Sequence, residues 1–228
     1  MSTIAIVGAG PGLGMSIARE FGFHGFNVAL IARTQNKLDQ LVEELGAAGI
    51  EAAGFAADIM QRDTLDEALQ LASERFGGID VLEFSPAPGA AAADGLGMVD
   101  VMDVTVETMR PQLDYYLNAG ITAARAVLPG MLERRSGTLL FTSGAGSVTP
   151  IPMMGNINAA SAALRNWVIN LHNPLREHGI HAEHIAIGVY INSGSAETAA
   201  DTIAKTYWDA YQRRDGAERV YTVDVTAP

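Results

Sequence analysis

VGAGPGLG, residues 7–14, is the stretch that decides the fold. It follows a short apolar run and precedes a segment of helical period that we expect to begin near Leu13. Gly8, Gly12 and Gly14 leave room for a tight turn, for close approach of backbone to phosphate and for packing of helix on strand. The helix would present free backbone N–H groups and the positive end of its dipole to a pyrophosphate. The stretch predicts a nucleotide-binding turn, with a merely structural turn as the alternative.

Short apolar runs alternate with segments of helical period along the rest of the chain. We expect strands over residues 3–7, 27–32, 51–57, 79–84, 138–142, 182–188 and 219–223. We expect helices over residues 13–24, 35–48, 62–76, about 105–134, 155–177 and 198–213. Continuous apolar strands separated by helices are typical of parallel strands joined by right-handed crossovers. The predicted fold is one α/β domain over residues 1–228, a Rossmann-type doubly wound, mainly parallel seven-stranded sheet with helices on both faces.

The composition narrows the choice of partners. The chain has 228 residues, a formal net charge of −11 and no cysteine. Nucleic acid and anionic membranes both require a basic surface, so neither is an expected partner. The lack of cysteine excludes disulfides and thiolate catalysis and fits a reducing compartment. The first residues have no basic segment and only a short apolar run, so we expect neither a signal peptide nor a membrane span, and a cytoplasmic protein.

Charged residues at the ends of the second and third predicted strands bear on the choice of nucleotide. An acidic residue at the end of the second strand would bind the ribose 2′-hydroxyl of NAD, whereas Arg33 suits the 2′-phosphate of NADP. Lys37, one helical turn later, adds positive charge. Asp58 lies at the same edge and could accept a hydrogen bond from the adenine amino group or cap the next helix. The pattern favours NADP(H) over NAD(H), with a solvated arginine as the alternative.

With these residues in place, the chain resembles the short-chain dehydrogenase/reductase family over nearly its whole length. The glycine motif of the family, often Thr-Gly-x-x-x-Gly-x-Gly, is similar to VGAGPGLG, with Val7 in place of threonine. The stretch AVLPGMLERRSGTLLFTSGAG, residues 126–146, is also typical of the family. The resemblance implies a cofactor site formed by Gly8, Gly12, Leu13, Gly14, Arg33, Asp58 and Ile59. It further implies an oxidoreductase that acts on a small carbonyl, alcohol or alkene and assembles as a homodimer or homotetramer.

The resemblance also assigns candidate catalytic roles. Ser143 occupies the position of a serine that hydrogen-bonds the substrate carbonyl or hydroxyl. Asn118 occupies the position of an asparagine that anchors a proton-relay water. Tyr190 follows the sixth strand, in a segment that contacts nicotinamide in the family, and is a candidate general acid. Tyr115 and Tyr116 are further candidates, and for each tyrosine a packed aromatic side chain is the alternative.

The segment MMGNINAASAAL, residues 153–164, departs from the family pattern. The family places a proton-transferring tyrosine here and, four residues later, a lysine that lowers its pKa. These positions align with Ile157 and Ser161, and residues 150–164 contain neither tyrosine nor lysine. Arg165 is a candidate cation if its side chain points inward. Two hypotheses follow: an NADP(H)-binding oxidoreductase with a different proton donor, or a catalytically inactive family member that binds NADP(H) as a sensor or partner subunit.

Two connections lie at the expected ligand-binding edge. Residues 84–100 form the clearest loop, rich in Gly, Pro and Ala. Because this loop follows a strand, it is expected either to face a ligand or to serve as a plain connection. The connection at about residues 193–197 is short. In the family this region folds over the substrate, so the resemblance implies a pocket that is shallow or built by a partner chain.

Three histidines, His178, His181 and His184, follow one another at a spacing of three residues. The last two fall on opposite faces of a predicted strand, so they cannot converge on one ion. We expect surface or edge histidines and no metal site.

Overall fold

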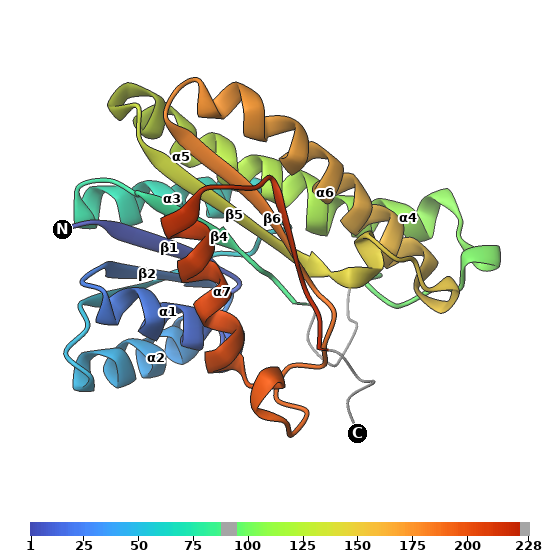
Figure 1. Cartoon of the computed structure of the whole chain (residues 1–228), viewed down its shortest axis with the longest axis horizontal. Helices are drawn as coiled ribbons and strands as arrows, with labels where there is room; N and C mark the ends of the chain where they lie inside the picture. The colour runs from blue at the N-terminus through green and yellow to red at the C-terminus, as the bar shows by residue number, and fades with distance from the viewer. Residues whose placement is uncertain (88–94, 224–228) are drawn as a thin grey trace.

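The computed structural model describes residues 1–87 and 95–223. Its strands are β1 (Thr3–Val7), β2 (Asn27–Ala32), β3 (Ala52–Ala56), β4 (Val81–Phe84), β5 (Gly137–Gly144), β6 (Ile180–Ile187) and β7 (Glu218–Tyr221). They form one seven-stranded sheet in the order β3-β2-β1-β4-β5-β6-β7 (Figure 1). Every neighbouring pair is parallel. The predicted doubly wound, Rossmann-type sheet is confirmed.

The helices are α1 (Leu13–Phe23), α2 (Gln35–Ala47), α3 (Arg62–Phe76), α4 (Val106–Leu113), α5 (Ala119–Arg134), α6 (Gly155–Arg176) and α7 (Ala200–Arg213). Helices α3, α5 and α6 cover one face of the sheet, and α1, α2 and α7 cover the other (Figure 1). Within residues 1–87 and 95–223, no helix combines the length and the hydrophobicity needed to cross a bilayer.

The inner strands contribute to two separate cores because successive side chains point to opposite faces of a sheet. In β1, Ala5 and Val7 pack in the core beneath α3, α5 and α6, whereas Ile4 and Ile6 pack in the core beneath α1, α2 and α7. All four side chains are fully buried. The apolar runs of the sequence therefore form central strands covered on both faces, as expected for a parallel sheet.

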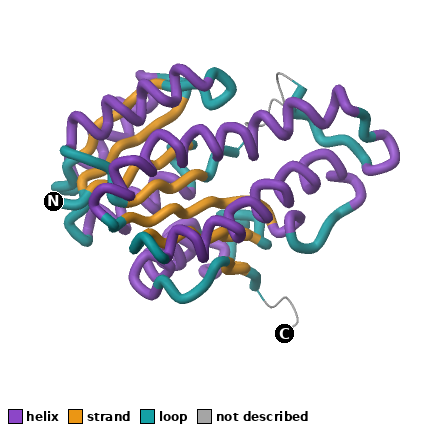
Figure 2. Tube along the Cα trace, turned by 90° about the horizontal axis from the view of Figure 1, so that it is seen from above, coloured by secondary structure: helices purple, strands orange, loops and turns teal. Residues whose placement is uncertain are grey.

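The predicted helical region over residues 105–134 is not one regular helix. A π-helical turn, Asp114–Asn118, separates α4 from α5, and Pro111 lies inside α4. A π-turn inserts extra residues into a helix and redirects the side chains around it. Here the turn buries Tyr115 and Tyr116. In Figure 1, α4 and the first turns of α6 extend past the tip of β5, and Figure 2 shows helix and loop without strand in that part of the molecule.

Candidate functional site

A cleft of 970 Å³ lies along the carboxyl edge of the sheet. Its lining includes residues 8–14, 32–34, 85–87 and 142–144, which follow or end β1, β2, β4 and β5. This is the edge at which open α/β sheets bind their ligands. Residues 85–87 of the predicted loop are part of the lining, whereas residues 88–94 of that loop lie outside the described part of the chain.

The glycine turn between β1 and α1 borders this cleft. Gly8 has a φ of +99°, and a Cβ on it would lie 2.6 Å from the Cα of Pro86, so only glycine fits. Its N–H donates to the carbonyl of Ile31 over 2.9 Å. Gly12 is the N-cap residue of α1, where a Cβ would meet no described atom within 4 Å and no side chain caps the helix. Gly12, Leu13 and Gly14 all line the cleft at the start of this helix, which fits a phosphate-bearing ligand.

Positive charge lines the cleft at the end of β2. Arg33 and Lys37 are both exposed and both belong to the lining. In the sheet order β2 is separated from β5 by β1 and β4. At a spacing of about 4.8 Å between strands, β2 and β5 lie about 14 Å apart. The cleft thus extends across enough of the sheet to hold an elongated ligand with an anionic group at Arg33.

Asp58 and Ile59 lie beyond the carboxyl end of β3. The Asp58 carboxylate accepts a hydrogen bond from the Met60 N–H over 3.0 Å, and the Asp58 N–H donates to Thr64 Oγ1 over 3.1 Å. These bonds hold the turn that leads into α3. Ile59 packs against the cluster that contains Tyr115. Neither Asp58 nor Ile59 is among the described residues that line the 970 Å³ cleft, so their contact with adenine stays a prediction.

Ser143 is the last residue but one of β5, lines the cleft and is 5% exposed. Its Oγ lies 2.8 Å from His184 Nε2 and 3.0 Å from Ser147 Oγ. The Nδ1 of His184 lies 3.1 Å from Glu218 Oε1. Glu218 Oε2 in turn accepts a hydrogen bond from Arg165 Nη2 over 2.7 Å. Residues from three adjacent strands, together with one from α6, form a continuous chain of polar contacts that begins at the cleft.

The charges along this chain follow from burial and pairing. Burial lowers the pKa of His184 to about 4, against the raising effect of the Glu218 carboxylate. Hydrogen bonding from Arg165 holds the pKa of Glu218 below its usual value. At neutral pH, His184 is therefore neutral and Glu218 is ionised.

The prediction of surface or edge histidines is wrong for His181 and His184, which are 4% and 0% exposed. Strand β6 lies between β5 and β7 and is covered on both faces, so its side chains are removed from water. Each imidazole is paired with a carboxylate, Glu183 for His181 and Glu218 for His184. Pairing of this kind is what allows a polar side chain to be buried.

Asn118 lies at the end of the π-helical turn. Its Nδ2 donates to Asp114 Oδ1 over 2.6 Å. It lines a second groove, of 440 Å³, formed with residues 104–106, Met109 and Arg110 among others. The described lining of the 970 Å³ cleft does not include Asn118. Its relay role is therefore a prediction to which this geometry adds no support.

The three candidate tyrosines differ in their surroundings. Tyr190 is 90% exposed and does not belong to the described lining of the cleft. Tyr116 lines the cleft, and burial raises its pKa to about 12. Burial also raises the pKa of Tyr115, with the neighbouring Tyr116 adding to the effect. A raised pKa makes a phenol a weaker acid at neutral pH, so these two tyrosines fit the alternative of packed aromatic side chains better than that of proton donors.

Helix α6 carries the segment that departs from the family pattern. Ile157 packs against the cluster of Tyr115 and Tyr116, and Ser161 is buried. Arg165, one turn after Ser161, is half-buried, and its guanidinium pairs with Glu218 instead of a tyrosine. The arginine therefore acts on the chain of contacts that ends at Ser143.

A buried carboxyl group lies beneath the cleft, and sequence reasoning did not identify it. Glu83 on β4 is fully buried and accepts hydrogen bonds from Ser85 Oγ over 2.9 Å and Thr142 Oγ1 over 3.1 Å. Thr142 also contacts the hydroxyl of Tyr207 over 2.8 Å. Burial raises the pKa of Glu83 to about 8, against the lowering effect of the two hydroxyl donors. Glu83 is therefore a neutral acid at neutral pH, bonded to two residues of the cleft lining.

The known proteins that resemble this chain are dehydrogenases and reductases. Residues 2–202 match the family model described as short chain dehydrogenase. The pig (Sus scrofa) protein named dehydrogenase/reductase SDR family member 4 is 27% identical over 205 residues, 90% of this chain and 71% of the relative. A duck (Anas platyrhynchos) very-long-chain 3-oxoacyl-CoA reductase is 28% identical over 189 residues, 82% of this chain and 56% of the relative. L-sorbose reductase of Gluconobacter frateurii, solved with NADPH and L-sorbose, has a similar fold with a TM-score of 0.84 at 19% identity, covering 98% of this chain and 95% of the other.

Proposed function

The chain belongs to the short-chain dehydrogenase family, and on that basis we propose that it is an NADP(H)-dependent oxidoreductase acting on a small carbonyl, alcohol or alkene. The observation that carries this proposal is that one cleft is bordered by the glycine turn, by Arg33 and by Ser143. An oxidoreductase that uses a dinucleotide requires a phosphate-binding turn and a substrate site along one edge of the sheet. In this cleft the glycine turn would provide the first and the surroundings of Ser143 the second.

The residues that would hold the cofactor are those of the glycine turn and the end of β2. The N–H groups around Gly12, Leu13 and Gly14 would bind the pyrophosphate. Arg33 and Lys37 would bind the 2′-phosphate that distinguishes NADP(H) from NAD(H). When bound, the dinucleotide supplies or accepts the hydride. The presence of NADPH in the L-sorbose reductase structure supports this choice for a chain of similar fold.

Ser143 would orient the reacting oxygen of the substrate. Its hydroxyl lies at the carboxyl end of β5 and lines the cleft. We propose that the proton donor is not a tyrosine supported by a lysine, because Ile157 and Ser161 occupy the positions at which the family has those two residues. Roles for Asn118 and Tyr190, association into a homodimer or homotetramer, and a cytoplasmic location stay predictions.

The second candidate function is an inactive family member that binds NADP(H) as a sensor or partner subunit. The observation that favours it is the lack of tyrosine and lysine in residues 150–164. The two functions share cofactor binding and differ in turnover.

Turnover by the purified chain separates the two functions. NADPH is mixed with a panel of small ketones, aldehydes and activated alkenes, and NADP⁺ with a panel of alcohols, and absorbance at the nicotinamide band is followed. We expect NADPH oxidation with at least one carbonyl compound. Tight binding of NADPH without turnover across both panels would favour the sensor, and failure to bind either NADPH or NADH would contradict both functions.

A further inference from the structure

Ser143, His184 and Glu218 form a linear array across three neighbouring strands, β5, β6 and β7. The Ser143 hydroxyl approaches one imidazole nitrogen of His184 over 2.8 Å, and the Glu218 carboxylate approaches the other over 3.1 Å. His184 and Glu218 are paired residues in the register of β6 and β7. This order of hydroxyl, imidazole and carboxylate is the arrangement by which a base withdraws a proton from a serine.

The direction of the hydrogen bonds follows from the charges. The ionised Glu218 carboxylate can only accept, so it receives the Nδ1–H of neutral His184. Nε2 then carries the lone pair and accepts the hydroxyl proton of Ser143. Two other acceptors lie within reach of the Ser143 hydroxyl, Ser147 Oγ at 3.0 Å and the carbonyl oxygen of Gly144 at 3.2 Å. The imidazole nitrogen is the nearest of the three acceptors, at 2.8 Å, and the most basic, so we infer that the proton of Ser143 points at His184 and that its oxygen can receive a proton from the cleft.

We propose that these three residues form a proton relay in which His184 accepts the Ser143 proton while Ser143 accepts the proton of a substrate hydroxyl. The proposal rests on the proposed function for its substrate, an alcohol. In the oxidative direction the substrate O–H bond breaks and a new O–H bond forms at Ser143. The old Ser143 O–H bond breaks as an N–H bond forms at His184. The hydride of the substrate carbon passes to an oxidised nicotinamide dinucleotide, and the imidazolium later returns its proton to water.

Glu218 and Arg165 position this relay. The carboxylate fixes the tautomer of His184 and stabilises the imidazolium that forms when the proton arrives. Arg165 on α6 fixes the carboxylate and keeps it ionised. His172, also on α6, faces this part of the sheet but bonds the carbonyl of Ala182 through Nδ1. The charged groups that act on His184 are therefore Glu218 and Arg165.

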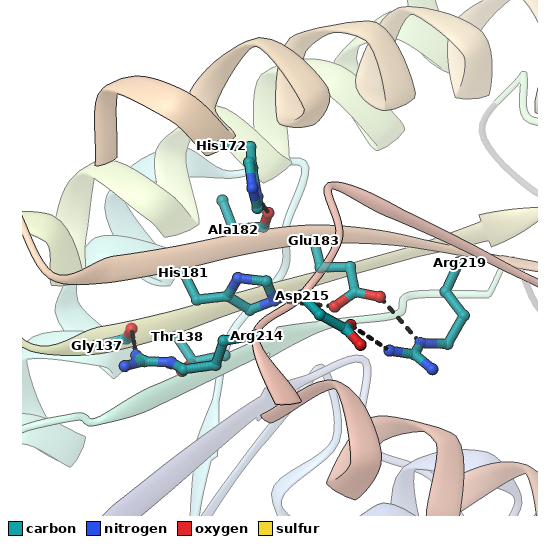
Figure 3. Close-up of polar contacts among 9 residues, drawn as sticks. All are labelled: Gly137, Thr138, His172, His181, Ala182, Glu183, Arg214, Asp215 and Arg219. Atoms are coloured by element: carbon teal, nitrogen blue, oxygen red, sulfur yellow. Dashed lines mark hydrogen bonds and ion pairs between the residues drawn. The ribbon is translucent and has the colours of Figure 1, made fainter. Parts of the chain in front are cut away.

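Strand β6 provides a matched control on its other face. His181 Nε2 bonds Glu183 Oε2 over 2.9 Å, and Glu183 Oε1 accepts from Arg219 Nε over 3.0 Å (Figure 3). His181, Glu183 and Arg219 match His184, Glu218 and Arg165 in residue type, and both imidazoles are buried. The Nε2 of His181, however, bonds a carboxylate and not a serine hydroxyl. A purely structural role for buried histidine pairs predicts that His181→Gln and His184→Gln have similar effects.

The experiment measures the reactivity of Ser143 in the full chain without any dinucleotide or substrate. Methanesulfonyl fluoride is a small serine reagent: the Ser143 oxygen forms a bond to sulfur, the S–F bond breaks, fluoride leaves and the serine proton goes to His184. Mass spectrometry of peptides gives the rate at Ser143 and at the exposed Ser193, which serves as the internal reference.

We expect modification of Ser143 at least about 10-fold faster than of Ser193 and a decrease of about 100-fold in His184→Gln, the scale of general base catalysis. His181→Gln is expected to stay within about twofold of the wild type, because it leaves the base at Ser143 intact. Glu218→Gln should slow the reaction and Glu218→Asp should recover part of the rate. Circular dichroism checks that each variant is folded.

The pH profile of the unmodified chain tests the relay without any substitution. Since burial lowers the pKa of His184 to about 4, the rate at Ser143 should be constant from about pH 5.5 to 8. A rate at Ser143 no greater than at Ser193, or an equal rate in His184→Gln and the wild type, overturns the relay. Loss of NADPH binding with rapid labelling of Ser143 would instead overturn the proposed function and leave the activated serine in place.

Discussion

Glu83→Gln is the substitution from which the structure gives the sharpest stability prediction. Glu83 is fully buried beneath the cleft, and burial raises its pKa from 4.5 to about 8. Glutamine has nearly the same shape but carries no proton that can be lost. The variant therefore removes one titration and leaves the packing of β4 almost unchanged.

The sign follows from the difference between the two states. The folded chain keeps the Glu83 proton up to about pH 8, whereas the unfolded chain loses it near pH 4.5. Between these values the unfolded state binds fewer protons, so the free energy of unfolding falls as the pH rises. Each pH unit in this window is worth about 1.4 kcal/mol, and the step from pH 5.5 to 7.5 therefore costs the wild type about 2.7 kcal/mol.

At low pH we expect the wild type to be more stable than Glu83→Gln. The glutamine side chain carries two amide N–H donors in place of the single O–H of the neutral acid, so one buried donor is left without a partner and about 1 kcal/mol is lost. Glu83→Gln should therefore be less stable than the wild type near pH 4.5 and more stable above about pH 7, since the penalty at pH 7 is about 3 kcal/mol.

The assay is urea unfolding at several pH values from 4.5 to 9, followed by tryptophan fluorescence. Glu133→Gln on the exposed surface of α5 is the matched control, because it makes the same chemical change without burial. The free energy of unfolding of Glu133→Gln, plotted against pH, should run parallel to that of the wild type. Parallel curves for Glu83→Gln and the wild type would refute the assignment of a neutral buried acid beneath the cleft.

Three further predictions concern Gly8, Arg165 and Tyr190. Gly8→Ala should lower the free energy of unfolding by about 2 kcal/mol or more, because φ is +99° and the methyl group would meet the backbone of Pro86. Gly10→Ala is the control: its methyl group would meet no atom within 4 Å, so it should be tolerated. Thermal melts compare the two variants. Arg165→Met should raise the pKa of Glu218. The free energy of unfolding of the variant should therefore increase less than that of the wild type as the pH rises from about 3 to 6. Urea unfolding measures this increase, and an equal increase in both proteins would contradict the pairing of Arg165 with Glu218. Tyr190→Phe should leave turnover within about twofold, because its ring is 90% exposed, and a loss of about 100-fold would restore it as the general acid.

The fold could be predicted because its signals are local. Continuous apolar runs, helical periods and the stretch VGAGPGLG are each read within a short window of the sequence. Strands β1 and β2 and helix α3 match their predicted bounds at both ends. The π-helical turn was not predicted because it changes only the hydrogen-bond spacing inside a helical region and leaves the amphipathic pattern nearly intact.

The polar residues of the site could be predicted only in part. Ser143, Arg33 and the glycine turn follow recognisable strands, so their place at the carboxyl edge was foreseeable, and the structure places all of them in the lining of one cleft. His184 and Glu83 lie within apolar strands, and their burial depends on partners distant in the sequence, such as Glu218 and Thr142. Such pairs depend on strand order and register, which a single sequence does not contain. The alternation of faces along β6 could have placed His184 on one face of the sheet, but not beside Ser143.

Binding of NADP(H) in the cleft through Arg33 is measured by titrating NADPH and NADH into the wild type and Arg33→Asp. We expect the wild type to bind NADPH more tightly than NADH. Loss of a charge-assisted contact of about 1.5–3 kcal/mol should weaken NADPH by about 10- to 100-fold in the variant, with a much smaller effect on NADH. Equal weakening of the binding of both nucleotides would contradict the role of Arg33, and no binding of either nucleotide at millimolar concentration would contradict NADP(H) binding in the cleft.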